Sequence, residues 1–246
     1  MKRLGWPVRI AILLVVLSAS LYALHWRVFH DADYVGKYVL AEVAFLPISV
    51  LIVVLILSRV LEAHEKRALR HKLNMVIGAF YSEVGSDLAR ALSEFDTGVA
   101  ELRARLAGAG DWDGPEFLQA SKHLRGAAYA MDPRRGDLAA LRSRLVAKRE
   151  FLLRLLENPN LLEHAAFTDL LWAVFHLTEE LAHRKNLAAL PDSDLEHLAG
   201  DLKRAYALLV AEWLLYVRHL KHDYPYLFSL AIRTNPFNPG ATVEIR

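Results

Sequence analysis

Two long apolar runs near the N-terminus constrain this chain more than any other feature of its sequence. The run from Ile10 to Leu24 has no charged residue, and the run from Tyr38 to Ser58 has a single one, Glu42. A helix that crosses the hydrocarbon core of a bilayer needs about 17 to 25 mostly apolar residues. The sequence therefore predicts two transmembrane helices, over about residues 8–26 and 38–58, within a membrane anchor formed by residues 1–58.

The charges that flank these runs predict their orientation. The connection from His25 to Lys37 carries two basic and two acidic residues, whereas both outer flanks are basic (Lys2, Arg3, Arg9; Arg59, Lys66, Arg67, Arg70, Lys72). Because cytoplasmic flanks are enriched in lysine and arginine, we expect a two-pass protein of the plasma or inner membrane with both termini in the cytoplasm. A cleaved signal peptide is the alternative for the first run, with small residues at 18–20 as its cleavage region.

The sequence after the second run is helical in pattern. Apolar residues recur at i, i+3, i+4 and i+7, and glycine and proline are confined to a few positions. The pattern predicts an all-α chain, with a cytoplasmic antiparallel helical bundle over residues 59–223 and an aromatic, proline-rich tail over 224–246. The expected helices continue the second run to about residue 106 and then cover about 115–130, 137–157, 160–186 and 193–223.

No catalytic motif stands out in the sequence. The chain has no cysteine, which excludes disulfides and thiolate chemistry, and it has no Gly-x-Ser-x-Gly elbow, Walker loop or Gly-x-Gly-x-x-Gly. The net charge of +2 gives no indication of a nucleic-acid partner. We therefore predict a non-enzymatic scaffold, regulatory or accessory subunit without a cofactor, which binds membrane lipids and a protein partner or a second copy of itself.

A metal-binding bundle, acting as an enzyme or a sensor, is the alternative. If residues 160–186 and 193–223 form a helical hairpin that turns near residue 190, His183 faces His197 and Glu180 faces Asp201. Imidazole nitrogens and carboxylate oxygens suit zinc, iron or manganese. The helical phase instead favours a solvated or subunit-facing polar stripe, because this face points away from the apolar positions of both helices.

Three further groups of residues are candidate contacts. Lys66, Arg67, Arg70 and Lys72 lie where a basic segment meets anionic headgroups. The carboxylate of Glu42 either reaches the nearby membrane–water interface or is a functional group within the membrane. Together with Pro47, it is the feature that would indicate an oligomeric channel or transporter subunit. The aromatic residues of the tail either pack onto the bundle or bind a partner (Tyr224, Tyr226, Phe228, Phe237).

One predicted helix is strongly basic. Residues 134–154 contain seven arginine and lysine residues against two acidic ones. The charged residues of the stretch 157–201 are mainly acidic, with nine aspartate and glutamate residues against Arg184 and Lys185. The basic helix is either a surface for anionic lipid or a partner for this neighbouring acidic stretch. The second interpretation is simpler, because the two regions are adjacent and opposite in sign.

Overall fold

A computed structural model describes residues 6–29, 32–159, 161 and 164–244, with side chains in these ranges except at 6–11, 14, 29, 32–35, 68, 70 and 71. These residues form helices and no strand, apart from an isolated bridge between Asp96 and Met131. The prediction of an all-α chain is confirmed for this part of the sequence. The chain divides into a first unit, Met1–Lys66, and a second unit, Arg67–Arg246.

Helix α1 (Trp6–Phe29) belongs to the first unit, and α2 (Ala32–Phe80) begins there and contains the boundary between the units. The described side chains of residues 36–61 are exposed, with Ser49 intermediate. Among the described residues, one helical stretch is long and apolar enough to cross a membrane, Gly36–Ser93, and none of its most apolar window is buried. The side chains at the start of α1 lie outside the described residues.

A π-helical turn, Tyr81–Gly85, follows α2 and leads into α3 (Ser86–Ser93). A Cβ added to Gly85 would lie 2.6 Å from the Tyr81 ring and 2.7 Å from the Phe80 ring. Glycine thus permits two large buried rings to pack against this turn. The turn is fastened to α9 because the Tyr81 hydroxyl donates a hydrogen bond to the carbonyl oxygen of Leu209, at 2.9 Å.

The prediction of one helix to residue 106 is wrong beyond Ser93, because the chain turns there and α4 begins at Val99 and ends at Leu106. Asp96 pairs with Met131 and accepts a hydrogen bond from the amide of Gly98, so this backbone is bonded across the unit. Helix α5 (Gly114–Arg125) ends before the expected residue 130, with Gly126 as its C-cap.

The helix expected over 137–157 is two helices, α6 (Leu138–Ala147) and α7 (Arg149–Leu156). They separate at Lys148, whose φ of −104° and ψ of 5° lie outside helical values. Of the expected 160–186 helix, the start signal at Asn160 and Glu163 lies outside the described residues, and α8 is Ala165–His183. Helix α9 is Asp192–Asp223, but Pro191 stands at its N-cap and Ser193 does not cap it.

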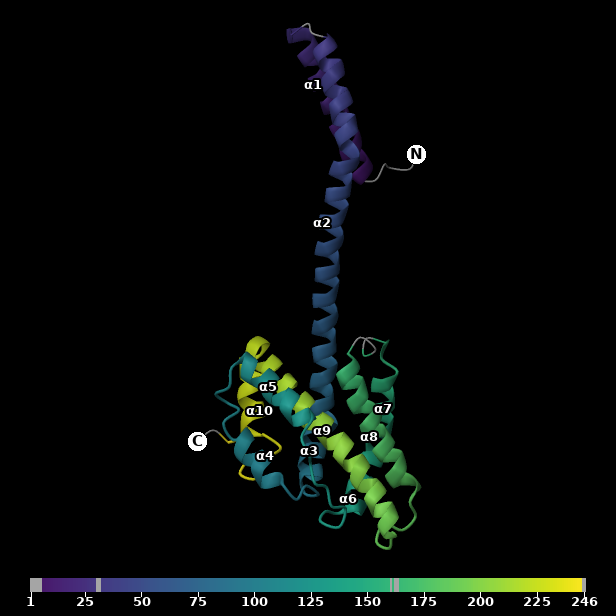
Figure 1. Cartoon of the computed structure of the whole chain (residues 1–246), viewed down its shortest axis with the longest axis vertical. Helices are drawn as coiled ribbons and strands as arrows, with labels where there is room; N and C mark the ends of the chain where they lie inside the picture. Colours follow the sequence, from purple (N-terminus) through teal and green to yellow (C-terminus); the bar gives the residue numbers. More distant parts are fainter. Residues whose placement is uncertain (1–5, 30–31, 160, 162–163, 245–246) are drawn as a thin grey trace. The chain divides into compact units, whose positions relative to one another are not determined.

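Helix α9 is the central element of the second unit. Helices α3, α5, α8 and α10 (Pro225–Arg233) contact it, while α6 and α7 pack on α8 (Figure 1). Trp213 and Tyr206 of α9 are almost fully buried, and Phe237 from the C-terminal segment closes over both, with ring centroids 5.4 and 6.3 Å away. Burial of such large apolar side chains is the main stabilising contribution to this unit.

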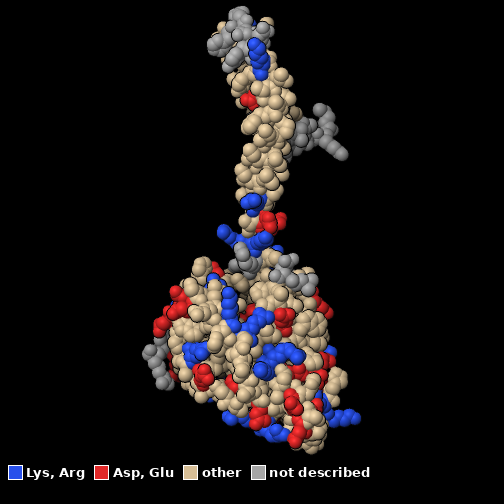
Figure 2. Space-filling view, in the orientation of Figure 1, with Lys and Arg blue, Asp and Glu red and all other residues tan. Residues whose placement is uncertain are grey.

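Charged side chains distinguish the surfaces of the two units. The first unit is mostly uncharged on the face drawn in Figure 2, whereas basic and acidic side chains intermix over the second. The basic residues of the α6–α7 region pair with acidic neighbours: Arg134 with Asp192 at 2.6 Å and Arg149 with Glu179 at 2.7 Å. These contacts favour the interpretation that the basic helix is a partner for the acidic stretch.

Candidate metal centre

The hairpin of α8 and α9 brings two histidine–carboxylate pairs together. His176 and Glu180 are four residues apart on α8, and His197 and Asp201 are four residues apart on α9. Residues at this spacing lie on the same face of a helix, one turn apart. The helices are held face to face by leucines from both, including Leu177, Leu181, Leu198 and Leu202, which are fully buried. The apolar contact therefore fixes the approach of the four polar side chains.

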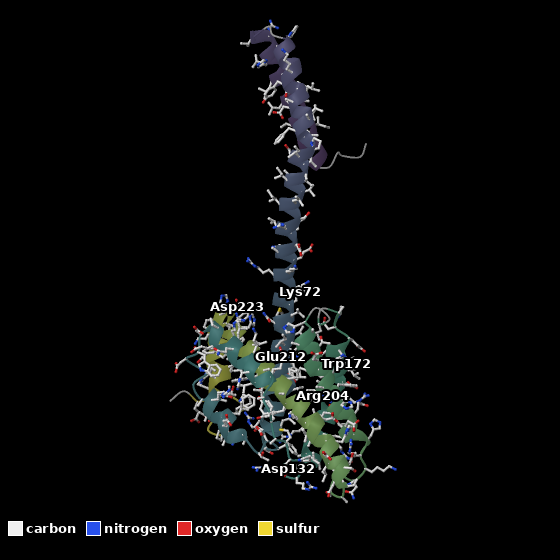
Figure 3. The ribbon with its side chains drawn as sticks, viewed as in Figure 1. Lys72, Asp132, Trp172, Arg204, Glu212 and Asp223 are labelled. Atoms are coloured by element: carbon white, nitrogen blue, oxygen red, sulfur yellow. The ribbon has the colours of Figure 1, made fainter. Side chains whose placement is uncertain are left out.

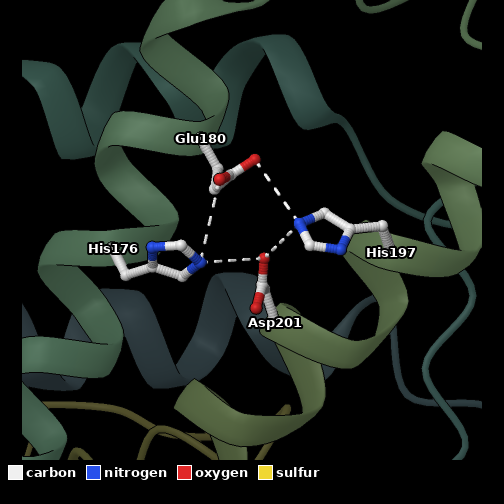
Figure 4. A group of neighbouring side chains, drawn as sticks. All are labelled: His176, Glu180, His197 and Asp201. Carbon is white, nitrogen blue, oxygen red and sulfur yellow. Dashed lines mark ion pairs between the residues drawn. The ribbon is translucent and has the colours of Figure 1, made fainter.

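One ligand atom from each of the four residues lies within 4.8 Å of the others. The Nε2 atom of His176 is 3.4 Å from Asp201 Oδ2 and 3.8 Å from Glu180 Oε1. The Nε2 atom of His197 is 3.3 Å from Asp201 Oδ2 and 3.6 Å from Glu180 Oε2 (Figure 4). Each imidazole thus faces both carboxylates.

These separations fit a small tetrahedral cation. With Zn–N and Zn–O bonds of about 2.0–2.1 Å, neighbouring ligand atoms of a tetrahedral zinc centre lie about 3.3–3.4 Å apart. The distances from both imidazoles to Asp201 Oδ2, 3.4 and 3.3 Å, are already in this range. The distance from His176 to Glu180 Oε1 is longer, at 3.8 Å, and His197 lies 3.6 Å from Glu180 Oε2, the oxygen that Arg184 also contacts. Two imidazoles and two carboxylates also suit iron(II) or manganese(II), although these ions favour more ligands than four.

Asp201 is the most deeply buried of the four side chains. Its side chain is 4% exposed, and its Oδ2 atom makes no hydrogen bond although both imidazole Nε2 atoms are near. Burial of a charged oxygen is costly unless a cation or hydrogen-bond donors compensate it. A divalent cation between the four residues removes this cost, because it contacts the buried oxygen directly.

Two arginines hold the carboxylates in place. Arg184 contacts Glu180 Oε2 at 2.6 Å and Asp194 at 2.6 Å, and Arg204 contacts Asp201 Oδ1 at 3.2 Å. The hydrogen bond from Arg184 lowers the pKa of Glu180 and also that of Asp194, which favours the ionised forms. Each carboxylate of the centre thus gives one oxygen to an arginine and leaves the other available to a metal ion. Hydrogen-bonded neighbours of this kind orient ligands and increase metal affinity.

Comparison with known proteins relates both parts of the chain to one family. Residues 69–233 match a family described as the C-terminal helical domain of uncharacterized protein MJ1433, and residues 2–61 match one described as its N-terminal helical domain. Uncharacterized protein MJ1433 of Methanocaldococcus jannaschii is 44% identical over 229 residues, which cover 93% of this chain and 92% of that protein. The chain belongs to the MJ1433 family. No solved structure matches it.

The four residues of the centre lie within the match to the MJ1433 C-terminal helical domain, and α1 lies within the match to the N-terminal one. The structure brings together three of the four metal ligands predicted from the sequence: Glu180, His197 and Asp201. His183 is not part of the group. Its Nδ1 atom lies 2.8 Å from the carbonyl oxygen of Glu179, and His176 takes its place in the group.

The register of the hairpin explains this difference. The sequence predicted that His183 faces His197 and that Glu180 faces Asp201, but Glu180 faces His197 and His176 faces Asp201. The pairing is displaced by about one helical turn, because residues 184–191 connect the two helices and Arg184 ties Glu180 to the start of α9. The matched His-x-x-x-Glu and His-x-x-x-Asp spacings were the signal that identifies His176.

The helical phase predicted a solvated or subunit-facing polar stripe on this face of both helices, but Asp201 is buried while His176 and His197 are each about half exposed. The group therefore lies along the edge of the α8–α9 contact, with one carboxylate beneath the imidazoles. Apolar periodicity identifies the centre of a helix contact and does not resolve its edges.

The other predicted contact residues have mixed surroundings. Glu42, Arg67 and Lys72 are exposed, Lys66 pairs with Glu62 at 2.7 Å, and the side chain of Arg70 lies outside the described residues. In the predicted tail, Phe237 is buried and Tyr226 is 71% exposed. Tyr224 and Phe228 are partly buried, and the ammonium group of Lys221 lies 5.1 Å from the Phe228 ring centroid.

Proposed function

We propose that this member of the MJ1433 family is a membrane-anchored metal-binding protein. Its second unit binds one divalent transition-metal ion, with zinc favoured, through His176, Glu180, His197 and Asp201. The buried Oδ2 atom of Asp201 carries the proposal, because two imidazoles and a second carboxylate converge on it. The protein acts as a regulatory or accessory subunit that responds to the metal.

The first unit supports the membrane part of the proposal. Leu40 is 72% exposed, Val60 is 60% exposed, and the apolar side chains between them are similarly accessible. Leaving each such side chain in water costs about 1.5–3 kcal/mol relative to burial, whereas a bilayer provides the apolar surroundings. The basic flanks favour two spans, with both termini and the second unit in the cytoplasm of a plasma or inner membrane.

The ligand set favours regulation over catalysis. Catalytic zinc sites usually have three protein ligands and keep a fourth position for water, whereas four protein side chains surround this centre. The two imidazoles are about half exposed, so an ion can enter and leave without unfolding the unit. A complete but accessible ligand set suits reversible binding, as a sensor or a metal-dependent partner subunit requires.

A metal titration of the full-length protein in detergent tests this proposal. After removal of metal with a chelator, isothermal titration calorimetry is expected to show one zinc ion bound per chain. Asp201→Asn and His197→Ala are each expected to weaken zinc binding by at least about 100-fold, because a ligand contributes more than the 10- to 100-fold of an outer-shell residue.

His183→Ala is the matched control. This histidine lies on the same helix as His176 and is exposed, but it is outside the group of four. Its loss is expected to leave zinc affinity unchanged. Absence of stoichiometric zinc binding to the wild-type protein, or an equal loss in His183→Ala, would contradict the proposed centre.

A further inference from the structure

A hollow of about 470 Å³ lies beside the metal centre on the same pair of helices. It shares His176 with the centre and is lined further by Asp169, Trp172 and Ala173 of α8 and by Arg204 and Leu208 of α9. Trp172 precedes His176 by one helical turn, and Arg204 follows Asp201 by three residues. The hollow therefore continues the edge of the α8–α9 contact that forms the metal centre.

The hollow combines an apolar wall with a cationic group. Trp172 is 57% exposed, which is unusual for the largest apolar side chain, and Leu208 stands on the opposite helix. Figure 3 labels Trp172 and Arg204 on the neighbouring helices. Asp169 pairs with Arg125 at 3.1 Å. The guanidinium of Arg204 contacts Asp201 Oδ1 with Nη1 but is 61% exposed, so among the residues that line this hollow it is the group that can also meet an anion.

A metal ion changes the charge that an anion meets there. Glu180, Asp194 and Asp201 carry three negative charges beside the two positive charges of Arg184 and Arg204. This cluster is therefore net negative by one charge when the histidines are neutral, and a divalent ion makes it net positive by one. The ion also competes with Arg204 for the charge of Asp201, because that arginine holds the other oxygen of the same carboxylate.

We propose that the metal-loaded protein binds a small carboxylic acid with an aromatic or branched aliphatic body in this hollow. The carboxylate pairs with the guanidinium of Arg204, and the body packs on the indole of Trp172 and on Leu208. Charge-assisted pairing with a planar guanidinium suits a carboxylate, and the indole face suits an apolar body. This inference rests on the proposed metal binding. The protein would then respond to the carboxylic acid as well as to the metal ion, because each strengthens the binding of the other.

The test uses phenylacetate as the probe, with full-length protein in detergent and with or without saturating zinc. Calorimetry and tryptophan fluorescence are expected to show phenylacetate binding at least about tenfold tighter to the zinc-loaded protein than to the metal-free protein. Zinc affinity must rise by the same factor in saturating phenylacetate, because the coupling between two binding sites is reciprocal. Acetate, which lacks the ring, and benzyl alcohol, which lacks the charge, are expected to bind at least about tenfold more weakly.

Variants separate the hollow from the metal centre. Trp172→Ala and Arg204→Gln are expected to weaken phenylacetate binding at least about tenfold, while Trp172→Ala leaves zinc affinity unchanged. Lys203→Gln, which removes the neighbouring exposed cation, is expected to have no effect. Normal zinc binding without zinc-dependent phenylacetate binding would overturn this inference and leave the proposed function standing. If the wild-type protein does not bind zinc, both this inference and the proposed function are overturned.

Discussion

Two buried carboxylates on α9 illustrate how local surroundings decide the role of a residue. Asp201 is buried against two imidazoles and an arginine, so it is suited to a cation. Glu212 is 2% exposed, and its Oε1 atom makes no hydrogen bond although Arg125 lies 3.9 Å away. Burial raises the pKa of Glu212 to about 7, and Arg125 opposes this only in part. Glu212 therefore holds a proton in the folded protein at a pH where it is ionised in the unfolded chain.

The raised pKa of Glu212 predicts a pH-dependent stability. Stability from this group is fully present below its ordinary pKa of 4.5 and is lost as the pH rises through about 7. In the presence of a chelator, Glu212→Gln is therefore expected to unfold like the wild-type protein at pH 5. At pH 8 the variant is expected to be more stable by about 3 kcal/mol, or about 6–12 °C in thermal midpoint by circular dichroism.

Glu83→Gln is the control for this experiment. Glu83 is exposed and pairs with Lys148 at the surface, so its loss is expected to change stability by less than about 1 kcal/mol at either pH. A Glu212→Gln variant that is less stable than the wild-type protein at pH 8 would show that ionised Glu212 is stabilised in the fold.

At the scale of elements, the sequence identifies helices well and their ends poorly. Apolar spacing predicts the regions of α5, α8 and α9, because these helices bury one continuous face. It does not predict the turn after Ser93, which is hydrogen-bonded to the distant segment 130–132, or the break at Lys148. Likewise, three of the metal ligands can be proposed from spacing, but the choice of His176 over His183 requires the hairpin register.

Helix α1 and the first part of α2 give the proposed anchor a testable topology. Because the chain has no cysteine, a single introduced cysteine reports its own location. Asp33→Cys in the short connection is expected to react with a membrane-impermeant maleimide in intact cells, whereas Ser193→Cys is expected to react only after permeabilisation. Labelling of Ser193→Cys in intact cells would contradict the proposed cytoplasmic location of the second unit.

For the molecule as a whole, the match to the MJ1433 family spans the apolar helices and the helical unit together. We propose that the apolar helices lie in a membrane and that the helical unit binds a metal ion. Composition indicates this division, because the first 60 residues carry most of the uninterrupted apolar sequence. The proposed metal centre requires the folded unit, since its residues come from two helices joined by the connection 184–191.

X-ray absorption spectroscopy of the zinc-loaded, full-length protein tests the metal centre most directly. The account predicts one zinc ion per chain with four nitrogen and oxygen neighbours at about 2.0–2.1 Å and the scattering signature of two imidazoles. The signature of one imidazole is expected to disappear in His176→Ala and to persist in His183→Ala. A first shell of six oxygen atoms without imidazole scattering, or a spectrum changed by His183→Ala and not by His176→Ala, would contradict the account.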